Sequence, residues 1–120
     1  MQKNDSSTNL KYFKDKVKEF VEQRGWTKYH TPKNLIQALS IEVAELNELF
    51  LFKEEGVDEI LNNPEKLKKI SDEVADIFIY LISFINTLDL DLTESFNLKM
   101  EKNDKKYSVD EFNKGYYRKK

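Results

Sequence analysis

A chain of 120 residues with 39% hydrophobic and 35% charged side chains has the size of one domain with a heavily solvated surface. Its formal net charge of −2 provides no strong field for a nucleic acid polymer or an anionic membrane. The absence of cysteine excludes a disulfide framework, a thiol nucleophile and a thiolate metal site.

The chain begins with a polar segment, residues 1–8, which we expect to be flexible. This segment lacks the apolar run of a signal peptide, and no run is long enough to cross a membrane, so we expect a soluble, cytoplasmic protein. A first helix is predicted from Leu10, where apolar residues recur at helical spacing, and Gly25 is its stop signal. The loop WTKYHTPKN follows.

Two long helices are predicted in the middle of the chain. Thr31 offers a hydroxyl N-cap and Pro32 suits a first turn, so one helix should run from Pro32 to Phe52 or Lys53. The dipeptide at 63–64, Asn-Pro, opens another helix that should end at about Leu88. The connection between them has room for a short helical turn at Val57–Leu61.

A fourth helix is predicted from Leu92 to Lys105, with Asp91 or Thr93 as its cap, before a polar, aromatic and basic tail. The chain then divides into residues 1–8, a helical domain over 9–107 and a tail over 108–120. Three glycines and two prolines are too few for a sheet with tight turns. The fold class predicted is all-α, with a four-helix bundle-like protomer.

Acidic side chains interrupt the apolar face of the second helix. With Glu42 at zero and a step of about 100° per residue, Leu49 falls at about 340° and Leu46 at about 40°. Glu42 therefore lies inside the apolar stripe. On the same scale Glu45 falls at the edge of the stripe, at about 300°, and Glu48 falls outside it, at about 240°.

The third helix repeats this arrangement. With Glu73 at zero, Tyr80 falls at about 340° and Phe84 at about 20°, so Glu73 also lies inside an apolar stripe. Asp76 is at the edge of that stripe, at about 300°. Each of the two helices thus has a pair of carboxylates at i, i+3 on the border of its core-facing stripe.

Buried carboxylates cost several kcal/mol unless they are paired, protonated or bound. From residue 34 to 52 and from 71 to 98 the sequence has no Lys, Arg or His, so neither helix supplies a partner near its own acids. The first helix could supply one through Lys14, Lys16, Lys18 or Arg24. A structural acid cluster stays open, but four acids at matched positions favour a divalent cation. Oxygen ligands suit Mg²⁺, Mn²⁺ or Ca²⁺, and a single histidine in a loop argues against di-iron or zinc.

Three segments together resemble a known family: HTPKNLIQALSIEVAELNELF, DEVADIFIYLI and KMEKNDKKY. They are similar to the MazG-like branch of the all-α nucleotide pyrophosphohydrolases, above all to its dCTP pyrophosphatase group. The resemblance extends from about Phe13 to Tyr107. It implies hydrolysis of a nucleoside triphosphate, such as dCTP or a modified pyrimidine nucleotide, to the monophosphate and pyrophosphate. It also implies Mg²⁺ (or Mn²⁺) as cofactor and a homodimer or homotetramer.

The resemblance also implies roles for the acids. Glu42, Glu45, Glu73 and Asp76 match the metal ligands of the motif, and Glu42 or Glu45 could serve as general base. Glu48 matches a further motif acid that either orients water or is only solvated.

Substrate contacts are implied by match to the same motifs. Trp26 matches a tryptophan that stacks on the base, and Tyr80 shares the acid-bearing face of its helix. Phe52 stands where close relatives have tryptophan, and Val17 where they have histidine, so the base preference is open. The residues that match the segment holding the triphosphate, or that could touch substrate, are Lys99, Asn103, Tyr107 and His30.

Two other functions fit the same sequence. One is a noncatalytic helical module that keeps the fold for partner binding. The other is a relative acting on dUTP or phosphoribosyl-ATP. Intact acids in both motifs argue against the first, and the flanks HTPKNL and KMEKN argue against the second.

Overall fold

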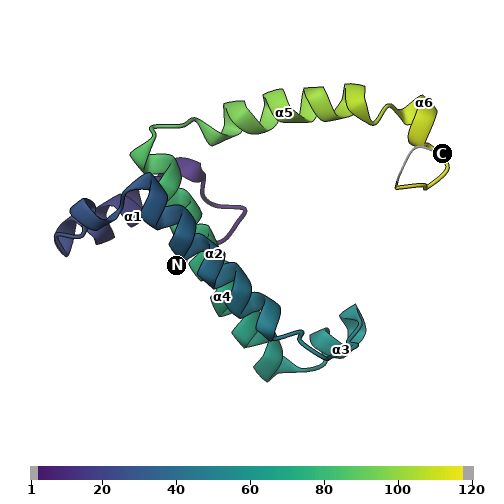
Figure 1. Cartoon of the computed structure of the whole chain (residues 1–120), viewed down its shortest axis with the longest axis horizontal. Helices are drawn as coiled ribbons and strands as arrows, with labels where there is room; N and C mark the ends of the chain where they lie inside the picture. Colours follow the sequence, from purple (N-terminus) through teal and green to yellow (C-terminus); the bar gives the residue numbers. More distant parts are fainter. Residues whose placement is uncertain (1–2, 118–120) are drawn as a thin grey trace. The chain divides into compact units, whose positions relative to one another are not determined.

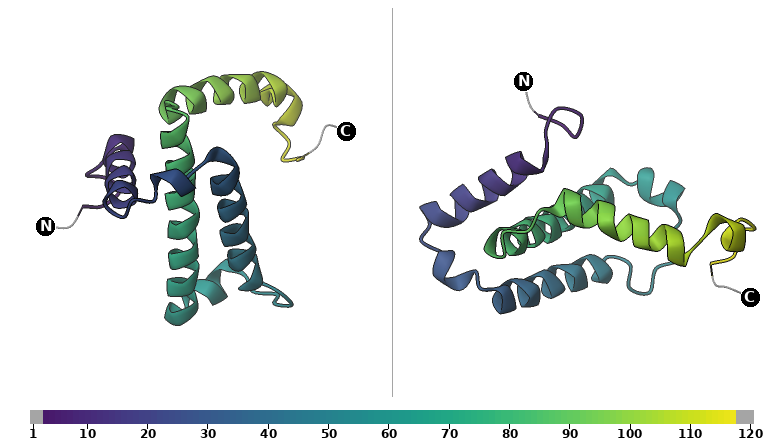
Figure 2. Two further views of the ribbon diagram at one scale, coloured as in Figure 1. Left: turned by 60° about the vertical axis from the view of Figure 1, so that its left-hand side comes forward. Right: turned by 90° about the horizontal axis from the view of Figure 1, so that it is seen from above.

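The structure is a computed structural model that describes residues 3–117. Within that range all regular structure is helical, which confirms the predicted fold class (Figures 1 and 2). The elements in chain order are α1 (Leu10–Gln23), the 3-10 helix η1 (Thr27–Tyr29), α2 (Pro32–Glu48), α3 (Val57–Leu61), α4 (Pro64–Thr87), α5 (Leu92–Lys106) and α6 (Val109–Phe112).

The chain divides after Asp89 into two compact units, which are described separately. The first contains α1 to α4, and the second contains α5 and α6. Within residues 3–117, no helix has the length and apolar character needed to span a membrane.

Side-chain caps start the long helices where the sequence predicts them. The Thr31 hydroxyl accepts a hydrogen bond from the Asn34 N–H, and the Asn63 side chain accepts one from the Lys66 N–H. Both helices have proline in their first turn. At α5 the cap is Asp91, which accepts from the Glu94 N–H, rather than the alternative Thr93.

The C-terminal end of α2 differs from the prediction, because the helix ends at Glu48 and not at Phe52 or Lys53. Beyond it, N–H groups bond to carbonyls three residues earlier, as in Leu51 to Glu48 at 3.2 Å, and these turns replace the α-helical pattern. The backbone of Phe52 is left-handed, with φ of 60°. The apolar run Leu-Phe-Leu-Phe contains no stop signal, so periodicity alone extends the helix too far.

The other boundaries lie close to those predicted. α3 occupies Val57–Leu61, α4 ends at Thr87 with Leu88 as its C-cap, and α5 ends one residue later than expected. α6 forms where only a tail is predicted. Within the second unit, the rings of Tyr107 and Phe112 lie edge to face at 5.5 Å, an apolar contact across this turn.

α4 is the centre of the first unit, since α1, α2 and α3 all contact it. α2 and α4 lie side by side and run in opposite directions (Figures 1 and 2). Ile82 and Ile85 of α4 are buried together with Leu35 of α2 and Val21 of α1. These are the fully buried hydrophobic residues among those described, so the core of this unit is small.

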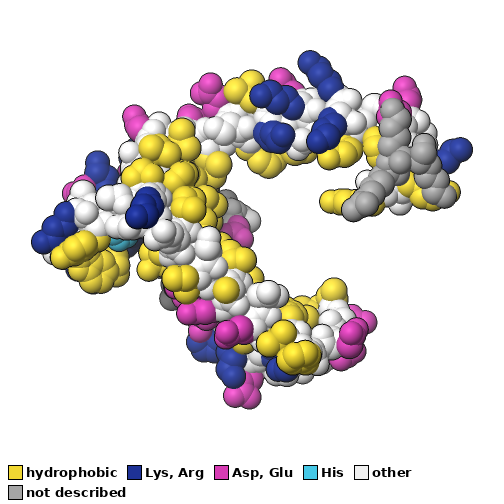
Figure 3. Space-filling model, viewed as in Figure 1, with side chains coloured by type: hydrophobic (Ala, Val, Ile, Leu, Met, Phe, Trp, Pro, Cys, Tyr) yellow, Lys and Arg dark blue, Asp and Glu magenta, His cyan; other side chains and the backbone are white. Residues whose placement is uncertain are grey.

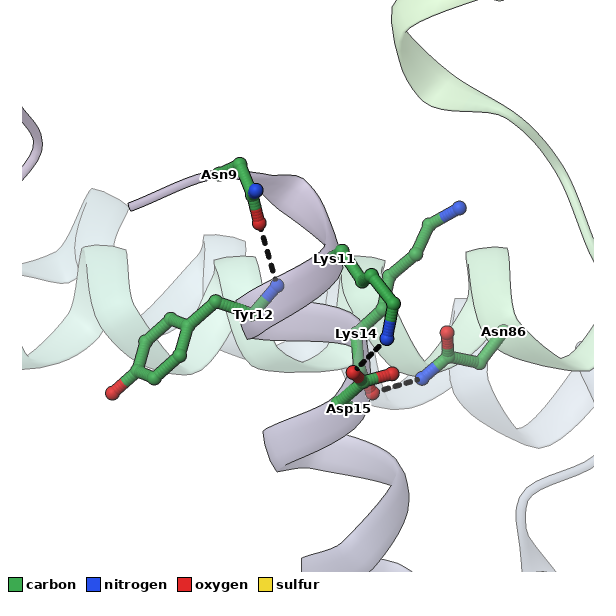
Figure 4. A network of polar contacts seen from close by, with 6 residues as sticks. All are labelled: Asn9, Lys11, Tyr12, Lys14, Asp15 and Asn86. Carbon is green, nitrogen blue, oxygen red and sulfur yellow. Dashed lines mark hydrogen bonds and ion pairs between the residues drawn. The ribbon is translucent and has the colours of Figure 1, made fainter. Parts of the chain in front are cut away.

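α1 is joined to α4 by one aromatic contact and one polar contact. The rings of Phe13 and Phe78 lie edge to face with centroids 5.1 Å apart. The Asn86 amide donates to the Lys14 carbonyl at 3.0 Å (Figure 4). The same view shows the Asn9 side chain capping α1 at the Tyr12 N–H. The two contacts with α4 fix α1 against the second half of that helix.

A buried lysine lies at the other end of α4. The Lys66 side chain is only 8% exposed and forms an ion pair with Glu55. Its ammonium also lies 5.0 Å from the centroid of the Phe50 ring. This pair ties the connection between α2 and α4 to the first turn of α4.

Candidate active site

Carboxylates from α2 and α4 meet across the antiparallel pair. Glu42 of α2 and Glu73 and Asp76 of α4 each present an oxygen atom, and these atoms all lie within 4.8 Å of one another. Glu42 and Glu73 are half-buried, and Asp76 is exposed. The helical angles predict this grading, with the first acid of each pair turned inward.

Two oxygen atoms in this cluster are buried without a partner. Glu42 Oε2 and Glu73 Oε2 accept no hydrogen bond from the described residues. Leaving a buried acceptor unsatisfied costs about 1–3 kcal/mol, and more when the group is charged. The arrangement therefore calls for a proton or a cation between the two helices.

Burial and neighbouring acids raise the pKa of two of these carboxyl groups, Glu42 and Glu73. Burial is the largest cause that raises the pKa of Glu42 from 4.5 to about 7, and the carboxyl groups of Glu45, Glu73 and Asp76 contribute the rest. Burial is likewise the largest cause of the raised pKa of Glu73. At neutral pH the cluster is thus poised between holding a proton and holding full negative charge.

The acids of the cluster take part in none of four ion pairs that form among the described residues. These pairs are Lys11–Asp15, Lys18–Glu22, Lys66–Glu55 and Lys68–Asp72. Lys11 and Lys18 of α1 thus pair with acids of their own helix. A hard divalent cation fits the donor set, because every donor is a carboxylate oxygen and two of the oxygens lack any other partner.

The remaining acids of α2 lie as the helical angles predict. Glu45 is exposed, yet it is close enough to raise the pKa of Glu42. Glu48 is exposed at the last position of α2. On α4, Tyr80 is half-buried, one turn beyond Asp76.

Trp26 and His30 flank η1 in the first unit. Trp26 is 43% exposed, with its ring edge to face against Phe20 at 5.9 Å. His30 is half-buried, and its Nδ1 lies 2.8 Å from the Ser83 hydroxyl of α4. Burial lowers the pKa of His30, so the ring is held neutral. The contact with Ser83 braces the loop against α4 and leaves Nε2 for another partner.

Phe52 and Val17 present contrasting environments. The Phe52 side chain is 97% exposed on its left-handed backbone. Val17 is half-buried and lines an apolar pocket of about 350 Å³ with aromatic neighbours Tyr12, Phe13, Phe20 and Phe78.

Lys99, Asn103 and Tyr107 lie in the second unit. They follow one another at four-residue intervals, so they share one face of α5 and its C-cap. Asn103 is half-buried, while the other two side chains are exposed. The Tyr107 N–H closes the helix by donating to the Asn103 carbonyl at 2.7 Å.

The MazG-like family matches residues 37–117, which is more than half of the chain. The chain belongs to the MazG-like family. Its predicted membership is thus confirmed, and the matched segment contains both pairs of acids.

Curated relatives of this MazG-like chain include two dCTP pyrophosphatases. The dCTP pyrophosphatase 1 of Bos taurus is 36% identical over 92 residues, covering 76% of this chain and 54% of that protein. The Homo sapiens dCTP pyrophosphatase 1 is 34% identical over 90 residues, covering 74% of this chain and 53% of that protein. The chain spans about half the length of the curated relatives it matches.

A solved structure agrees with the fold. The crystal structure of a pyrophosphatase from Archaeoglobus fulgidus DSM 4304 superposes with a TM-score of 0.76 and 35% sequence identity. The superposition covers 90% of this chain and 98% of that one.

Sequence reasoning missed the partner of His30. Ser83 is one of several polar residues on a mostly apolar helix, and a hydrogen bond across 53 positions leaves no periodic signal. It also missed the buried Lys66–Glu55 pair, because a lysine in the first turn of a helix is ordinarily solvated.

Proposed function

We propose that this MazG-like protein is a Mg²⁺-dependent nucleoside triphosphate pyrophosphohydrolase. It converts a nucleoside or deoxynucleoside triphosphate, with dCTP or a modified pyrimidine nucleotide preferred, to the monophosphate and pyrophosphate. The observation that supports this most is the cluster of Glu42, Glu73 and Asp76, with its two unpartnered buried oxygens. The names of the curated relatives and of the similar solved structure agree with this reaction class.

Glu42, Glu45, Glu73 and Asp76 would hold the metal between α2 and α4. When bound, Mg²⁺ or Mn²⁺ neutralises phosphate charge and lowers the pKa of water. The carboxylates supply a rigid set of oxygen donors, because each pair lies one helical turn apart on a helix that packs against the other.

A general base comes from the same set. A base works best when its pKa lies near the working pH, and burial with the neighbouring acids brings the pKa of Glu42 to about 7. Glu42 or Glu45 would accept the proton of the attacking water. Glu45 is the more accessible of the two, since it is exposed while Glu42 is half-buried.

Substrate recognition would use aromatic rings and polar groups. Trp26 and Phe52 present exposed ring faces on which a base can stack, and Tyr80 and His30 offer a hydroxyl and a free ring nitrogen. The donors of the second unit that would hold the triphosphate are Lys99, Asn103 and Tyr107.

We also propose that the protein works as a homodimer or homotetramer. Hydrophobic side chains gather on the surface of the first unit over α2 and α4 (Figure 3). Ile41 is 60% exposed, and Val43, Val74 and Ile79 are exposed as well. Apolar surface of this kind in a helical unit with a small core is typical of a subunit interface.

The function is tested by incubating the purified protein with a panel of nucleotides, with and without Mg²⁺, and identifying the products. Monophosphate plus pyrophosphate from dCTP, only with the metal, is the expected result. Preference for dUTP or phosphoribosyl-ATP would reassign the substrate. If no triphosphate or related pyrophosphate compound is hydrolysed, the alternative function, a noncatalytic helical module, would be favoured.

A further inference from the structure

Two lysines lie near the acid-bearing helices, at the same end of the α2–α4 pair. Lys53 is the first basic residue after the acids of α2, and Lys69 is the last one before the acids of α4. Because the two helices run in opposite directions, these positions come together. Both side chains line one pocket of about 200 Å³, which has room for roughly six water molecules. The full lining is Leu49, Lys53, Asn63, Glu65, Lys66 and Lys69.

This pocket continues the face on which the carboxylates lie. Lys69 precedes Glu73 by one turn, about 6 Å along the helix axis, and its direction falls between those of Glu73 and Asp76. On the facing helix, Leu49 follows Glu42 by two turns on nearly the same side. The pocket and the acid cluster therefore lie on the same side of the α2–α4 pair, about one turn apart on α4 and about two turns apart on α2.

The charges in the pocket are not all satisfied within the protein. Lys66 is buried and neutralised by Glu55. Neither Lys53 nor Lys69 has an ion pair with any described residue, although the adjacent Lys68 has one with Asp72 at 3.6 Å. Glu65 is the single acid of the lining. Two unpaired ammonium groups against one carboxylate leave the pocket positive, one turn away from a strongly negative cluster.

We propose that this pocket binds the terminal phosphates of the nucleotide and, after hydrolysis, the pyrophosphate product. The inference rests on the proposed function. A triphosphate extends over several ångströms, so if Glu42, Glu73 and Asp76 held the metal with the inner phosphates, the outer ones would come within reach of the flexible side chains of Lys53 and Lys69. Lysine ammonium groups suit phosphate oxygens as charge-assisted donors. Lys53 and Lys69 are thus the phosphate contacts that the first unit would supply.

The test measures inhibition of nucleotide hydrolysis by inorganic pyrophosphate and, separately, by the nucleoside monophosphate. Lys53→Gln and Lys69→Gln should each weaken pyrophosphate inhibition about tenfold, since a hydrogen bond to a charged group is lost. Inhibition by the monophosphate should stay unchanged, because that product lacks the outer phosphates. Lys68→Gln, one residue away and paired with Asp72, is the matched control and should change neither.

A variant that should have the opposite effect on pyrophosphate inhibition distinguishes lost phosphate binding from structural damage. Glu65→Gln removes the acid from the lining, so it should strengthen pyrophosphate inhibition. Unchanged pyrophosphate inhibition in both lysine variants, or an equal loss of monophosphate inhibition, would overturn the proposal.

A calorimetric titration of inorganic pyrophosphate in Mg²⁺ buffer separates this inference from the proposed function. If the wild-type protein hydrolyses no triphosphate, the proposed function fails. Pyrophosphate binding by the wild type that weakens in Lys53→Gln and Lys69→Gln would still support the pocket. No binding by the wild type, or binding that is unchanged in both variants, would refute it.

Discussion

At the scale of single residues, the surroundings of Glu42 and its proposed role favour different protonation states of the same carboxyl group. Its position in an apolar stripe disfavours charge, and its acidic neighbours disfavour it further, so its pKa rises to about 7. The proposed metal requires the charged form. The same carboxyl is therefore a source of instability in the metal-free protein and a ligand in the metal-bound one.

Replacing Glu42 should affect catalysis and thermal stability in different ways. Glu42→Gln should lower turnover of the preferred triphosphate about 100-fold or more, because a ligand and candidate base is lost. The metal-free variant should melt no lower than wild type, since repulsion within the cluster is relieved. Steady-state kinetics and thermal melts in EDTA measure the two effects.

Asp58→Asn is the control for that experiment, because Asp58 is exposed on α3 and belongs neither to the cluster nor to the acidic motifs. Wild-type activity in Glu42→Gln would show that the metal assignment is wrong.

The raised pKa of Glu42 also predicts how stability depends on pH. Between pH 4.5 and about 7 the folded protein binds more protons at this site than the unfolded chain, so its free energy of unfolding falls as pH rises. In EDTA, the melting temperature of the wild type should therefore fall, relative to that of Glu42→Gln, as the pH rises through this range. Millimolar Mg²⁺ should restore it, most strongly at pH 8, where protons no longer compete.

Melting curves of both proteins across pH, with EDTA or Mg²⁺, give the comparison. A wild-type curve parallel to that of the variant would mean that Glu42 ionises as an ordinary solvated acid.

At the scale of elements, the antiparallel pair α2 and α4 shows how far sequence can reach. The 3.6-residue period places Glu42 and Glu73 on inward faces, and the structure brings their oxygens together. The hydrophobic periodicity of a helix can be read from its own sequence, without information about the helix that it packs against. Contacts such as His30 with Ser83 depend on how elements meet, and the end of α2 depends on turns after Glu48, so neither could be predicted from sequence.

The Lys66–Glu55 pair makes a prediction about the connection between these helices. Glu55→Gln leaves a buried ammonium without its counter-charge, which should destabilise the fold by about 3 kcal/mol. Asp72→Asn breaks an exposed pair of the same kind and should cost less than about 0.5 kcal/mol. Urea denaturation of both variants measures the difference, and equal costs would contradict a structural role for the buried pair.

At the scale of the whole molecule, the small core is the main feature. Among the described residues only Val21, Leu35, Ile82 and Ile85 are fully buried hydrophobic residues, while many large apolar side chains are exposed. Association would bury this surface, which is why we propose a dimer or tetramer.

Ile41 tests that proposal, because it is 60% exposed on α2 and lies outside the acid cluster. Ile41→Glu should reduce the molecular mass in solution toward that of a 14.3 kDa monomer and make the melting temperature fall. Light scattering coupled to size exclusion gives the mass, and Lys11→Glu on the solvated face of α1 is the control. Wild type that is already monomeric at high concentration would refute the assembly.

The exposed ring of Phe52 has a consequence for how this protein can evolve. A side chain that is 97% exposed on a left-handed backbone contributes almost nothing to the packing of its own unit. Exchange between aromatic residues there should leave the fold intact, so the base stacking that we propose for position 52 could change without the usual trade-off against stability. Position 52 is accordingly the natural first choice for a saturation library aimed at new nucleobases.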